Sequence, residues 1–505
     1  MFRDGARKSI WQEEIKRFSS CPEDQQYFDV AIIGGGITGV STAYRLQLEG
    51  KRCILLEANN IGFGTTGGTT AHINDFFDTS YDEAIRKFGH ENAELLHAAG
   101  KEAVQLIEKT VARHHIDCDF QRKDAQLFAL DEKQEQLLAD MVEGSRKVGH
   151  QMHYIPSISY PIPFKKAVLI PNQAQFHPVK YIKALAEIFV QHGGVIVEDC
   201  LCTGHEEQDD QILLQTSLGD LHVAQLLYAT HTPPGVNLLH FTTAPYRSYA
   251  IAFSLKGQQY PQELGYDLDD PYHYYRTQVI DGRTLLIAGG EDHKTGHADD
   301  TGECFAHLEN YCRAHFDVDV VEYSWSSQYY EPADGLPSIG KLPGSNARVF
   351  VATGFRGNGM PFGSLSAAII TDLIVRGESR YEKLFNPSRF KPAAGFSSFV
   401  KENATVVHDM VADKLSMERI KSLSDIPAGE ARVVKYEGDS YAVYREKEGR
   451  VHLLKSTCPH AKCEVRWNKA ELSWDCPCHG SRFNINGRLL NAPATIALQR
   501  YDTDD

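Results

Sequence analysis

The sequence has few of the features that mark membrane, secreted or nucleic-acid-binding proteins. Its 505 residues contain no apolar stretch of the ~18 residues that a membrane-spanning helix needs. Asp4, Glu13 and Glu14 lie where a secretion signal would need an apolar run. No basic block offsets the net charge of −15, from 52 Lys and Arg against 67 Asp and Glu, which disfavours nucleic-acid and anionic-membrane partners. We therefore expect a soluble cytoplasmic protein without a transmembrane segment.

Cysteine is scarce as well. The 11 cysteines are too few and too unevenly placed for an extracellular disulfide scaffold, and four of them lie between Cys458 and Cys478. That clustering indicates a metal site. The other seven are expected to be small buried hydrophobic residues; they are Cys21, Cys53, Cys118, Cys200, Cys202, Cys304 and Cys312.

The hydrophobic pattern changes period near the start of the chain. An apolar run from Val30 to Ile33 is followed by a glycine turn, a helical stretch to Glu49, and a second apolar run from Cys53 to Leu56. This order predicts a parallel strand pair joined by a crossover helix. Aromatic-rich strands between Tyr246 and Gly290 predict an antiparallel sheet, and the short, evenly spaced strands of the final ~85 residues predict a small β domain.

The glycine turn carries a dinucleotide-binding pattern. Gly34, Gly36 and Gly39 form G-x-G-x-x-G, whose glycines permit a tight turn, close approach of a pyrophosphate and close helix packing. Glu57 closes the second strand, where a carboxylate can accept hydrogen bonds from ribose hydroxyls. The motif alone does not distinguish NAD from FAD.

A second glycine turn, from Ala352 to Met360, again follows a strand and precedes a helix. Its backbone amides and helix dipole could serve a pyrophosphate or the flavin carbonyls. With GTTGGTTAH from Gly64, DGLPSIG from Asp334 and an interrupted strand order, the chain from about Tyr27 to Glu378 resembles the D-amino-acid oxidase superfamily of FAD-dependent oxidoreductases.

The resemblance implies FAD. Some relatives attach the flavin covalently through His or Cys, but His72 does not lie at a matching position, so we expect noncovalent FAD. Its adenosine half would be held by Gly34, Gly36, Gly39 and Glu57, with the backbone of Leu201 or Cys202 near the adenine. The resemblance also implies a set of cofactor-binding residues on the flavin side: Thr69, Thr70, Thr353, Gly354, Gly357, Asn358, Gly359 and Met360.

The clustered cysteines lie in two boxes, CPHAKC from Cys458 and CPCHGS from Cys476. Cys458, His460, Cys476 and His479 offer two thiolates and two imidazoles. This set suits either a tetrahedral structural zinc or a [2Fe-2S] cluster with two Cys on one iron and two His on the other.

The two boxes resemble those of Rieske proteins, whose loops are joined by a disulfide. The resemblance implies a [2Fe-2S] cluster on those four ligands, a disulfide between Cys463 and Cys478, and a hydrogen bond from Ser481 to a bridging sulfide. Imidazole ligands make such a cluster easier to reduce than an all-cysteine one. Respiratory Rieske proteins have a tyrosine where this chain has Phe483, so we expect an intermediate reduction potential.

Together the resemblances imply an α/β (α+β) fold, with a Rossmann-like FAD-binding domain, an antiparallel-sheet substrate domain and a small all-β Rieske domain. The expected boundaries are 1–27 for a lead-in with a short helix around Ile10 to Phe18, 28–390 for the oxidoreductase, 391–420 for a linker and polar helix, and 421–505 for the Rieske domain. Within 28–390, we assign 28–80, 165–235 and 333–390 to the FAD-binding domain, and 81–164 and 236–332 to the substrate domain.

A flavin takes two electrons as a hydride and can release them singly, whereas the cluster carries one. We therefore expect an FAD-dependent oxidoreductase, a dehydrogenase of a small amine or amino acid that passes electrons through the cluster to an external acceptor. Two alternatives stay open: a reductase in which the cluster feeds the flavin, and a flavoprotein with a structural zinc tail. The oligomeric state is open too.

By analogy with the superfamily, an amine bearing a carboxylate would need an Arg and a Tyr near the flavin. The catalytic candidates are Arg356, Tyr249, Arg276 and His293, and each could also be a sheet-face or surface residue. Arg356 is the first choice because its turn should border the flavin. We interpret His177 and His231 as surface or cap residues.

Overall fold

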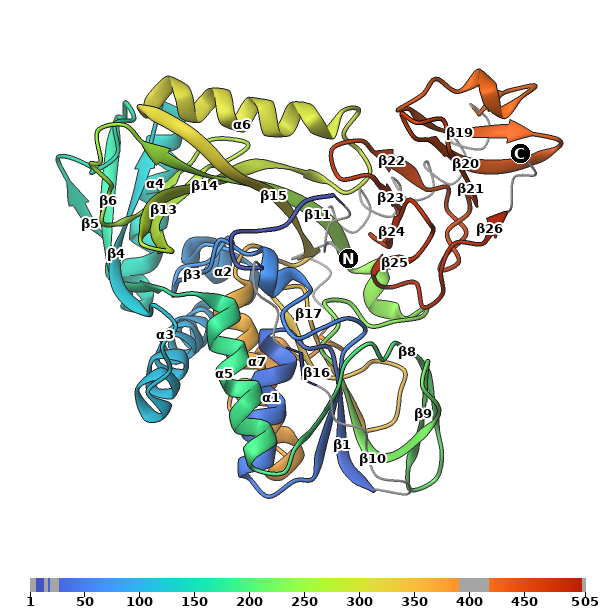
Figure 1. Cartoon of the computed structure of the whole chain (residues 1–505). Helices are drawn as coiled ribbons and strands as arrows, with labels where there is room; N and C mark the ends of the chain where they lie inside the picture. The colour runs from blue at the N-terminus through green and yellow to red at the C-terminus, as the bar shows by residue number, and fades with distance from the viewer. Residues whose placement is uncertain (1–5, 13–16, 19–26, 390–416, 502–505) are drawn as a thin grey trace.

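The computed structural model describes residues 6–12, 17–18, 27–389 and 417–501. Residues 27–389, the main part, form an eight-stranded and a nine-stranded sheet, and residues 417–501, the C-terminal part, form a five-stranded and a four-stranded sheet. In Figure 1 the C-terminal part lies beside the end of the nine-stranded sheet where β11 and β15 are labelled. The α/β (α+β) fold class is confirmed.

The eight-stranded sheet has the order β16-β17-β10-β1-β2-β7, with β9 and β8 added beside β10. Its strands are β1 (Phe28–Ile33), β2 (Cys53–Leu56), β7 (Val195–Val197), β8 (Cys202–Glu207), β9 (Ile212–Thr216), β10 (Leu221–Tyr228), β16 (Ser338–Lys341) and β17 (Val349–Thr353). The central strands β10, β1 and β2 pair in parallel. They are nearly continuous apolar runs because a central parallel strand is buried on both faces.

Three helices cover one face of this sheet (Figure 1). They are α1 (Ile37–Leu48), α5 (Pro178–Gln191) and α7 (Gly359–Val375). Helices α1 and α7 each start directly after a glycine turn, as the sequence predicts. The short helix α8 (Glu382–Phe385) follows α7.

The nine-stranded sheet has the order β15-β11-β14-β13-β12-β4-β6-β3, with β5 beside β6. Its strands are β3 (His72–Ile73), β4 (Gln121–Ala129), β5 (His153–Ile155), β6 (Lys166–Gln175), β11 (Thr243–Leu255), β12 (Leu264–Asp267), β13 (Tyr274–Ile280), β14 (Arg283–Lys294) and β15 (Val318–Pro332). The accompanying helices are α2 (Tyr81–Phe88), α3 (His90–His114), α4 (Glu132–Val148) and α6 (Thr301–His315). The antiparallel sheet expected for the stretch of chain from Tyr246 to Gly290 is confirmed, because β11, β13 and β14 pair in antiparallel.

Three strands of this sheet depend on pairing that no local pattern in the sequence indicates. β4 interrupts a region whose Ala, Glu and Lys content favours helix, because pairing with β6 overrides local propensity. β3 and β6 also pair in this sheet, although the expected boundaries put 28–80 and 165–235 in the FAD-binding domain. The chain thus crosses between the two sheets more often than the sequence suggests.

The C-terminal part contains short strands around two loops. The strands are β18 (Glu418–Arg419), β19 (Ala431–Tyr436), β20 (Asp439–Arg445), β21 (Val451–Lys455), β22 (Arg466–Asn468), β23 (Ser473–Asp475), β24 (Arg482–Asn484), β25 (Leu489–Asn491) and β26 (Arg500–Tyr501). The predicted linker and most of the predicted polar helix, both expected within 391–420, lie outside the described residues. Where that helix enters them, the prediction is wrong, because residues 418 and 419 pair with β19 instead.

The N-terminal lead-in packs against the main part. Ile10 and Trp11 are buried in a turn, and the Trp11 indole N–H donates to the carbonyl of Thr69 at 2.6 Å. The predicted helix around Ile10 to Phe18 includes residues 13–16, which lie outside the described residues. The described part of the lead-in therefore supports the loop that precedes β3.

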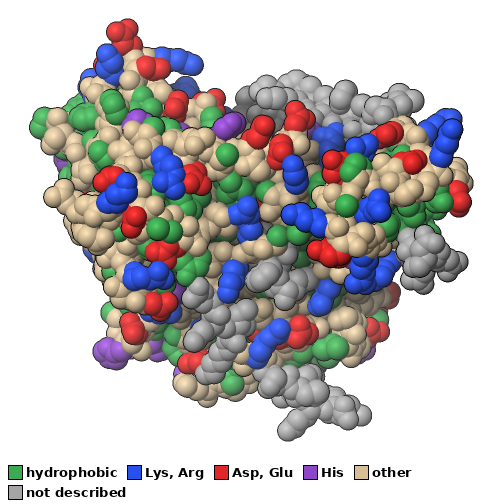
Figure 2. Space-filling view, turned by 45° about the horizontal axis from the view of Figure 1, so that its top comes forward, with side chains coloured by type: hydrophobic (Ala, Val, Ile, Leu, Met, Phe, Trp, Pro, Cys, Tyr) green, Lys and Arg blue, Asp and Glu red, His purple; other side chains and the backbone are tan. Residues whose placement is uncertain are grey.

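Charges of both signs are interspersed on the face shown in Figure 2. The figure shows no block of basic side chains on that face, in keeping with the net charge of −15. Within the described residues, none of the helices has the length and apolar character needed to cross a membrane.

Candidate functional site

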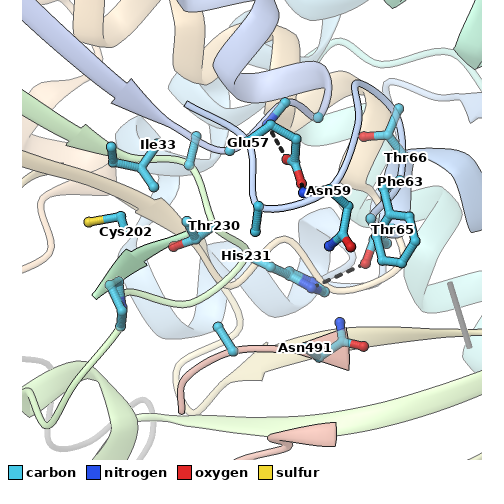
Figure 3. A pocket seen from close by; sticks show the side chains of 18 of the residues that line it. Ile33, Glu57, Asn59, Phe63, Thr65, Thr66, Cys202, Thr230, His231 and Asn491 are labelled. Carbon is cyan, nitrogen blue, oxygen red and sulfur yellow. Dashed lines mark hydrogen bonds between the residues drawn. The ribbon is translucent and has the colours of Figure 1, made fainter. Parts of the chain in front are cut away.

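A cavity of about 430 Å³ lies at the carboxyl ends of the central parallel strands (Figure 3). The turns after β1, β2 and β10 line it, together with the turn that opens α7. This crevice is the usual ligand position in open parallel sheets. A further wall comes from the C-terminal part, through residues 488–492, 494 and 497. The cavity therefore lies between the two parts of the molecule.

The glycine turn after β1 is packed too tightly for any side chain at two positions. A Cβ added at Gly34, whose φ is +111°, would lie 2.5 Å from the carbonyl oxygen of Ala229. A Cβ at Gly39 would lie 1.9 Å from the carbonyl oxygen of Gly34. Gly36 caps α1 and brings no side chain over the helix N-terminus, where the N–H of Ile37 donates to the Thr66 hydroxyl at 2.9 Å. A helix N-terminus of this kind favours an anion.

Glu57 faces the same turn from the end of β2. Its carboxylate accepts the backbone N–H of Gly35 at 2.7 Å and that of Asn59 at 2.8 Å. Burial raises the pKa of Glu57, although the two N–H donors partly offset this. Leu201 and Cys202, expected near the adenine, line the cavity too. A glycine cradle at a helix start beside a buried carboxylate fits the adenosine pyrophosphate of FAD.

The opposite end of the cavity is bordered by the second glycine turn. Arg356, Gly359 and Met360 line it, as do Thr65 and His231. Six of the residues expected near the flavin are not in the cavity lining: Thr353 ends β17, and Thr69, Thr70, Gly354, Gly357 and Asn358 lie in the adjoining loops. Asp78 joins the loops, because it accepts the N–H of Gly357 at 2.8 Å.

The four catalytic candidates are not brought together. Arg356 alone among them lines the cavity. Tyr249 is buried in the nine-stranded sheet, where its hydroxyl pairs with His293 Nε2 at 2.9 Å. Arg276 is fully buried and donates to the carbonyls of Thr70, Ala71 and Phe176. The bonds to Thr70 and Ala71 hold the loop between η1 (Thr65–Gly68) and β3. Arg276 therefore stabilises a loop next to the cavity and is not part of the cavity lining.

The predicted metal ligands converge in the C-terminal part. The thiols of Cys458 and Cys476 are buried and within hydrogen-bonding reach of each other. This contact lowers the pKa of Cys458 and raises that of Cys476. The rings of His460 and His479 lie 4.9 Å apart, and the Nδ1 atoms of both are buried and have no hydrogen-bond partner among the described residues. Two thiols and two unpartnered ring nitrogens fit a [2Fe-2S] cluster with His ligands.

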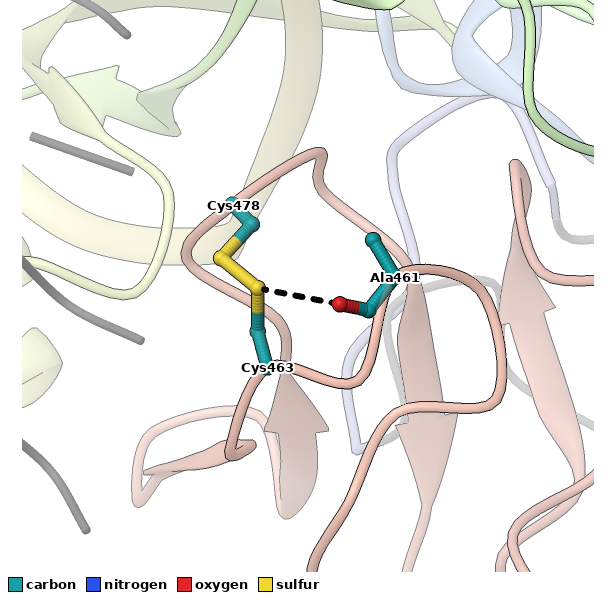
Figure 4. Close-up of a disulfide and its surroundings, with 3 residues drawn as sticks. All are labelled: Ala461, Cys463 and Cys478. Atoms are coloured by element: carbon teal, nitrogen blue, oxygen red, sulfur yellow. Dashed lines mark hydrogen bonds between the residues drawn. A yellow bond between two sulfur atoms is a disulfide. The ribbon is translucent and has the colours of Figure 1, made fainter. Parts of the chain in front are cut away.

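The two ligand loops are joined by the expected disulfide, Cys463–Cys478, with Cα atoms 6.5 Å apart (Figure 4). Its two sulfur atoms lie within 4.8 Å of Cys476, but they are bonded to each other and thus are not available as ligands. Ser481 lies beside Cys458 and accepts the N–H of Ala494 at 3.0 Å.

The scattered cysteines follow the expectation where the structure describes them. The buried ones are Cys53, Cys118, Cys200, Cys202 and Cys312. Cys304 is partly exposed, and Cys21 lies outside the described residues.

Three residues between the cavity and the ligand loops were not predicted from the sequence to be functional. His231, interpreted as a surface or cap residue, lines the cavity, and burial lowers its pKa to about 4. His240, in η2 (Leu238–Phe241), has its ring 4.7 Å from the ring of His460 and 5.5 Å from that of His479. Tyr330 of β15 donates to the carbonyl of His479 at 3.0 Å. His177, by contrast, caps α5 as interpreted.

Comparisons with known proteins divide the chain in the same way. A family model described as FAD dependent oxidoreductase matches residues 29–373, and one described as Rieske [2Fe-2S] domain matches residues 417–502. YhfW of Bacillus subtilis (strain 168), described as a Rieske 2Fe-2S iron-sulfur protein, is 34% identical over 507 aligned residues, which cover 100% of this chain and 99% of the relative.

More distant relatives match the main part. The gamma-glutamylputrescine oxidoreductase of Escherichia coli (strain K12) is 23% identical over 384 residues, covering 71% of this chain and 86% of the relative. The crystal structure of glycine oxidase from Geobacillus kaustophilus superposes with a TM-score of 0.61 at 19% identity, covering 72% of this chain and 100% of that one. At that identity the likeness concerns the fold.

Proposed function

Because this chain belongs to the FAD-dependent oxidoreductase family and carries a Rieske [2Fe-2S] domain, we propose that it is a dehydrogenase of a small amine or amino acid. Electrons would pass from FAD to the cluster and on to an external acceptor. FAD supplies a two-electron hydride acceptor when bound, and the cluster supplies a one-electron carrier.

The observation that carries this proposal is the shared wall of the cavity. Residues of the C-terminal part line the FAD cavity directly, through Arg488 to Ala492. The ligand loops also contact the main part, because His460 Nε2 bonds to the carbonyl of Gly235 at 3.1 Å. A structural tail would not need both contacts, whereas an electron carrier must lie close to the flavin.

The chain's own residues have separate tasks in this proposal. The glycine turn and Glu57 hold the adenosine half, and the segment from Arg488 closes one side of the cavity against water. Exclusion of water strengthens every electrostatic contact inside such a site. Arg356 faces the end where the substrate would meet the flavin.

The surroundings of Arg356 favour an amine over an amino acid. Its guanidinium lies 3.6 Å from Glu331 and 3.8 Å from Asp78. A substrate carboxylate would have to compete with these two carboxylates for Arg356, whereas an ammonium group would be attracted by them. We therefore propose a cationic amine as the substrate class.

The direct test is anaerobic addition of small amines and amino acids to the purified holoprotein. We expect loss of flavin absorbance followed by the EPR signal of a reduced [2Fe-2S] cluster. If the flavin is bleached only after a one-electron donor has reduced the cluster, electrons flow from the cluster to the flavin. A protein without iron and acid-labile sulfide would instead carry a structural zinc tail.

A further inference from the structure

Strand β15 passes between the FAD cavity and the second ligand loop. Two of its side chains, Gln328 and Tyr330, are 1% and 2% exposed and point toward that loop. Gln328 Nε2 donates to the carbonyl of Gly480 at 2.9 Å, and the Tyr330 hydroxyl donates to the carbonyl of His479 at 3.0 Å. The strand therefore binds the backbone of the loop that carries His479.

The ring of Tyr330 contacts a cavity residue on its other side. It meets the ring of His231 edge-on, with centroids 4.7 Å apart and planes at 88°. His231 lines the cavity beside Thr65, whose hydroxyl lies 3.2 Å from His231 Nδ1. The carbonyl of His231 accepts the Thr353 hydroxyl at 2.5 Å, which fixes the residue in place. Tyr330 thus spans the distance from a cavity residue to a ligand loop.

The close approach depends on a glycine. A Cβ at Gly480 would lie 2.6 Å from Gln328 Nε2 and 3.0 Å from the Tyr330 hydroxyl. Gly480 also has a φ of +79°, which suits glycine. The loop can therefore lie directly against β15.

Both imidazole ligands face the main part. His460 bonds to Gly235, and the ring of His240 lies against both ligand rings. His240 is outside the cavity lining, as far as the structure describes it, whereas the Tyr330 ring packs on a lining residue. Of these two aromatic residues of the main part, Tyr330 is therefore the better candidate to connect the cavity with a ligand loop.

We propose that the contact series His231, Tyr330 and His479 is the internal path for electrons between the flavin and the cluster, with Tyr330 as its coupling residue. This rests on the proposed function. Each transfer would move one electron from the reduced flavin, which carries two, to the cluster. That electron would convert one ferric ion of the cluster to ferrous. An external one-electron acceptor then removes it. Two such transfers would remove both electrons that the flavin took from the substrate, and the flavin's protons would pass to water. Tyr330 keeps its own proton and electrons.

The test uses the full-length holoprotein without any amine. The flavin is photoreduced anaerobically by a light flash with a sacrificial donor, and cluster reduction is followed by absorbance and by rapid-freeze EPR. Tyr330→Phe removes the bond to His479 but keeps the ring, and Tyr330→Leu removes the ring as well. Tyr228→Phe is the matched control, because Tyr228 is a buried tyrosine with a hydroxyl 2.8 Å from a histidine, His205, away from the ligand loops.

We expect Tyr330→Phe to slow cluster reduction about tenfold, through weaker electronic coupling at an unchanged driving force. Tyr330→Leu should slow it further, and the control should keep the wild-type rate. FAD content, iron content, the EPR g values and both midpoint potentials should not change.

Two results would overturn the path. The first is a wild-type rate in both Tyr330 variants, and the second is a slower rate accompanied by altered g values or potentials, which indicates a structural role. If the wild-type cluster is never reduced by the photoreduced flavin, the proposed function fails as well, so the two failures are distinguishable.

Discussion

Gly39 allows α1 to pack directly against the glycine turn of the FAD site, where there is no room for a Cβ atom. Because an added Cβ would lie 1.9 Å from the Gly34 carbonyl oxygen, Gly39→Ala must push α1 away from the turn. Overpacking of this kind costs about 1–3 kcal/mol. We expect that loss in the free energy of unfolding measured with urea, together with loss of bound FAD. Gly257→Ala is the control, since a Cβ there meets nothing within 4 Å. Full FAD occupancy in Gly39→Ala would contradict the cradle.

Asp292 should give the proposed amine site a pH dependence, because its charge interacts with those of Asp78 and Glu331, the two carboxylates beside Arg356. Burial raises its pKa to about 7, opposed by bonds from Ser248 and Tyr329 and reinforced by the charges of Asp78 and Glu331. Asp292 Oδ2 accepts the Tyr329 hydroxyl at 2.8 Å. Since the raised pKa keeps the carboxyl neutral below about pH 7, its negative charge develops above that pH.

We therefore expect a cationic amine to bind more tightly as the pH rises through about 7. Asp292→Asn should remove that step and weaken binding at high pH by about 1.5–3 kcal/mol, roughly tenfold to a hundredfold in Kd. Titration of the flavin spectrum with the amine at several pH values measures this. Ser254→Ala is the control, a change at a half-buried hydroxyl near the end of β11 that accepts the N–H of Val320 at 3.3 Å. An unchanged pH profile in Asp292→Asn would exclude this carboxylate from the site.

Residues that belong to a ligand-binding motif with fixed spacing could be predicted from the sequence. Residues whose role depends on contacts in the folded structure could not. The glycines, Glu57 and the four cluster ligands occur at spacings that their ligands require. His231 had one usable signal, its position just after β10, where parallel sheets bind ligands. Tyr330 had none, because its partners come from parts of the chain about 100 and 150 residues away, a separation that no local pattern records.

At the scale of elements, the disulfide ties the two ligand loops together across 15 residues. Closing a loop of that length stabilises a fold by about 3 kcal/mol in the chain-entropy account. We expect Cys463→Ala with Cys478→Ala to lower the free energy of unfolding by about that amount, measured by the loss of cluster absorbance in urea. Cys304→Ala is the control, as a free cysteine outside the centre. Equal unfolding curves would show that the bond contributes nothing.

Elements with strong periodicity were predictable, and short or tertiary-dependent ones were not. β1, α1 and β2 follow from apolar runs around a glycine turn. β4 contains Ala, Gln and Leu, which also suit a helix, and becomes a strand through its pairing with β6. β18 contains only two residues, and its pairing with β19 decides its form.

At the scale of the whole molecule, a buried ion network joins the two parts. Arg247 of β11 lies 2.6 Å from Glu471 of the C-terminal part, and Arg482 and Asp475 extend the network. Arg247 and Glu471 are 1% and 0% exposed. Burial alone would raise the pKa of Glu471, but the two arginines hold it below its ordinary value. The network contains two positive and two negative groups, so its net charge is zero.

Because of this network, we expect separation of the two parts to require several kcal/mol of free energy. Arg247→Met leaves one uncompensated buried carboxylate, and breaking such a pair typically costs about 3–5 kcal/mol. We expect that loss in the free energy of unfolding and faster proteolysis between the two parts. Adding Glu471→Gln should restore part of the loss, because Arg482 and Asp475 then balance each other. Arg432→Met is the surface control: its pair with Glu418 is exposed, so it should cost about 1 kcal/mol or less. Equal effects of the buried and the surface change would mean that the C-terminal part is not held by this network.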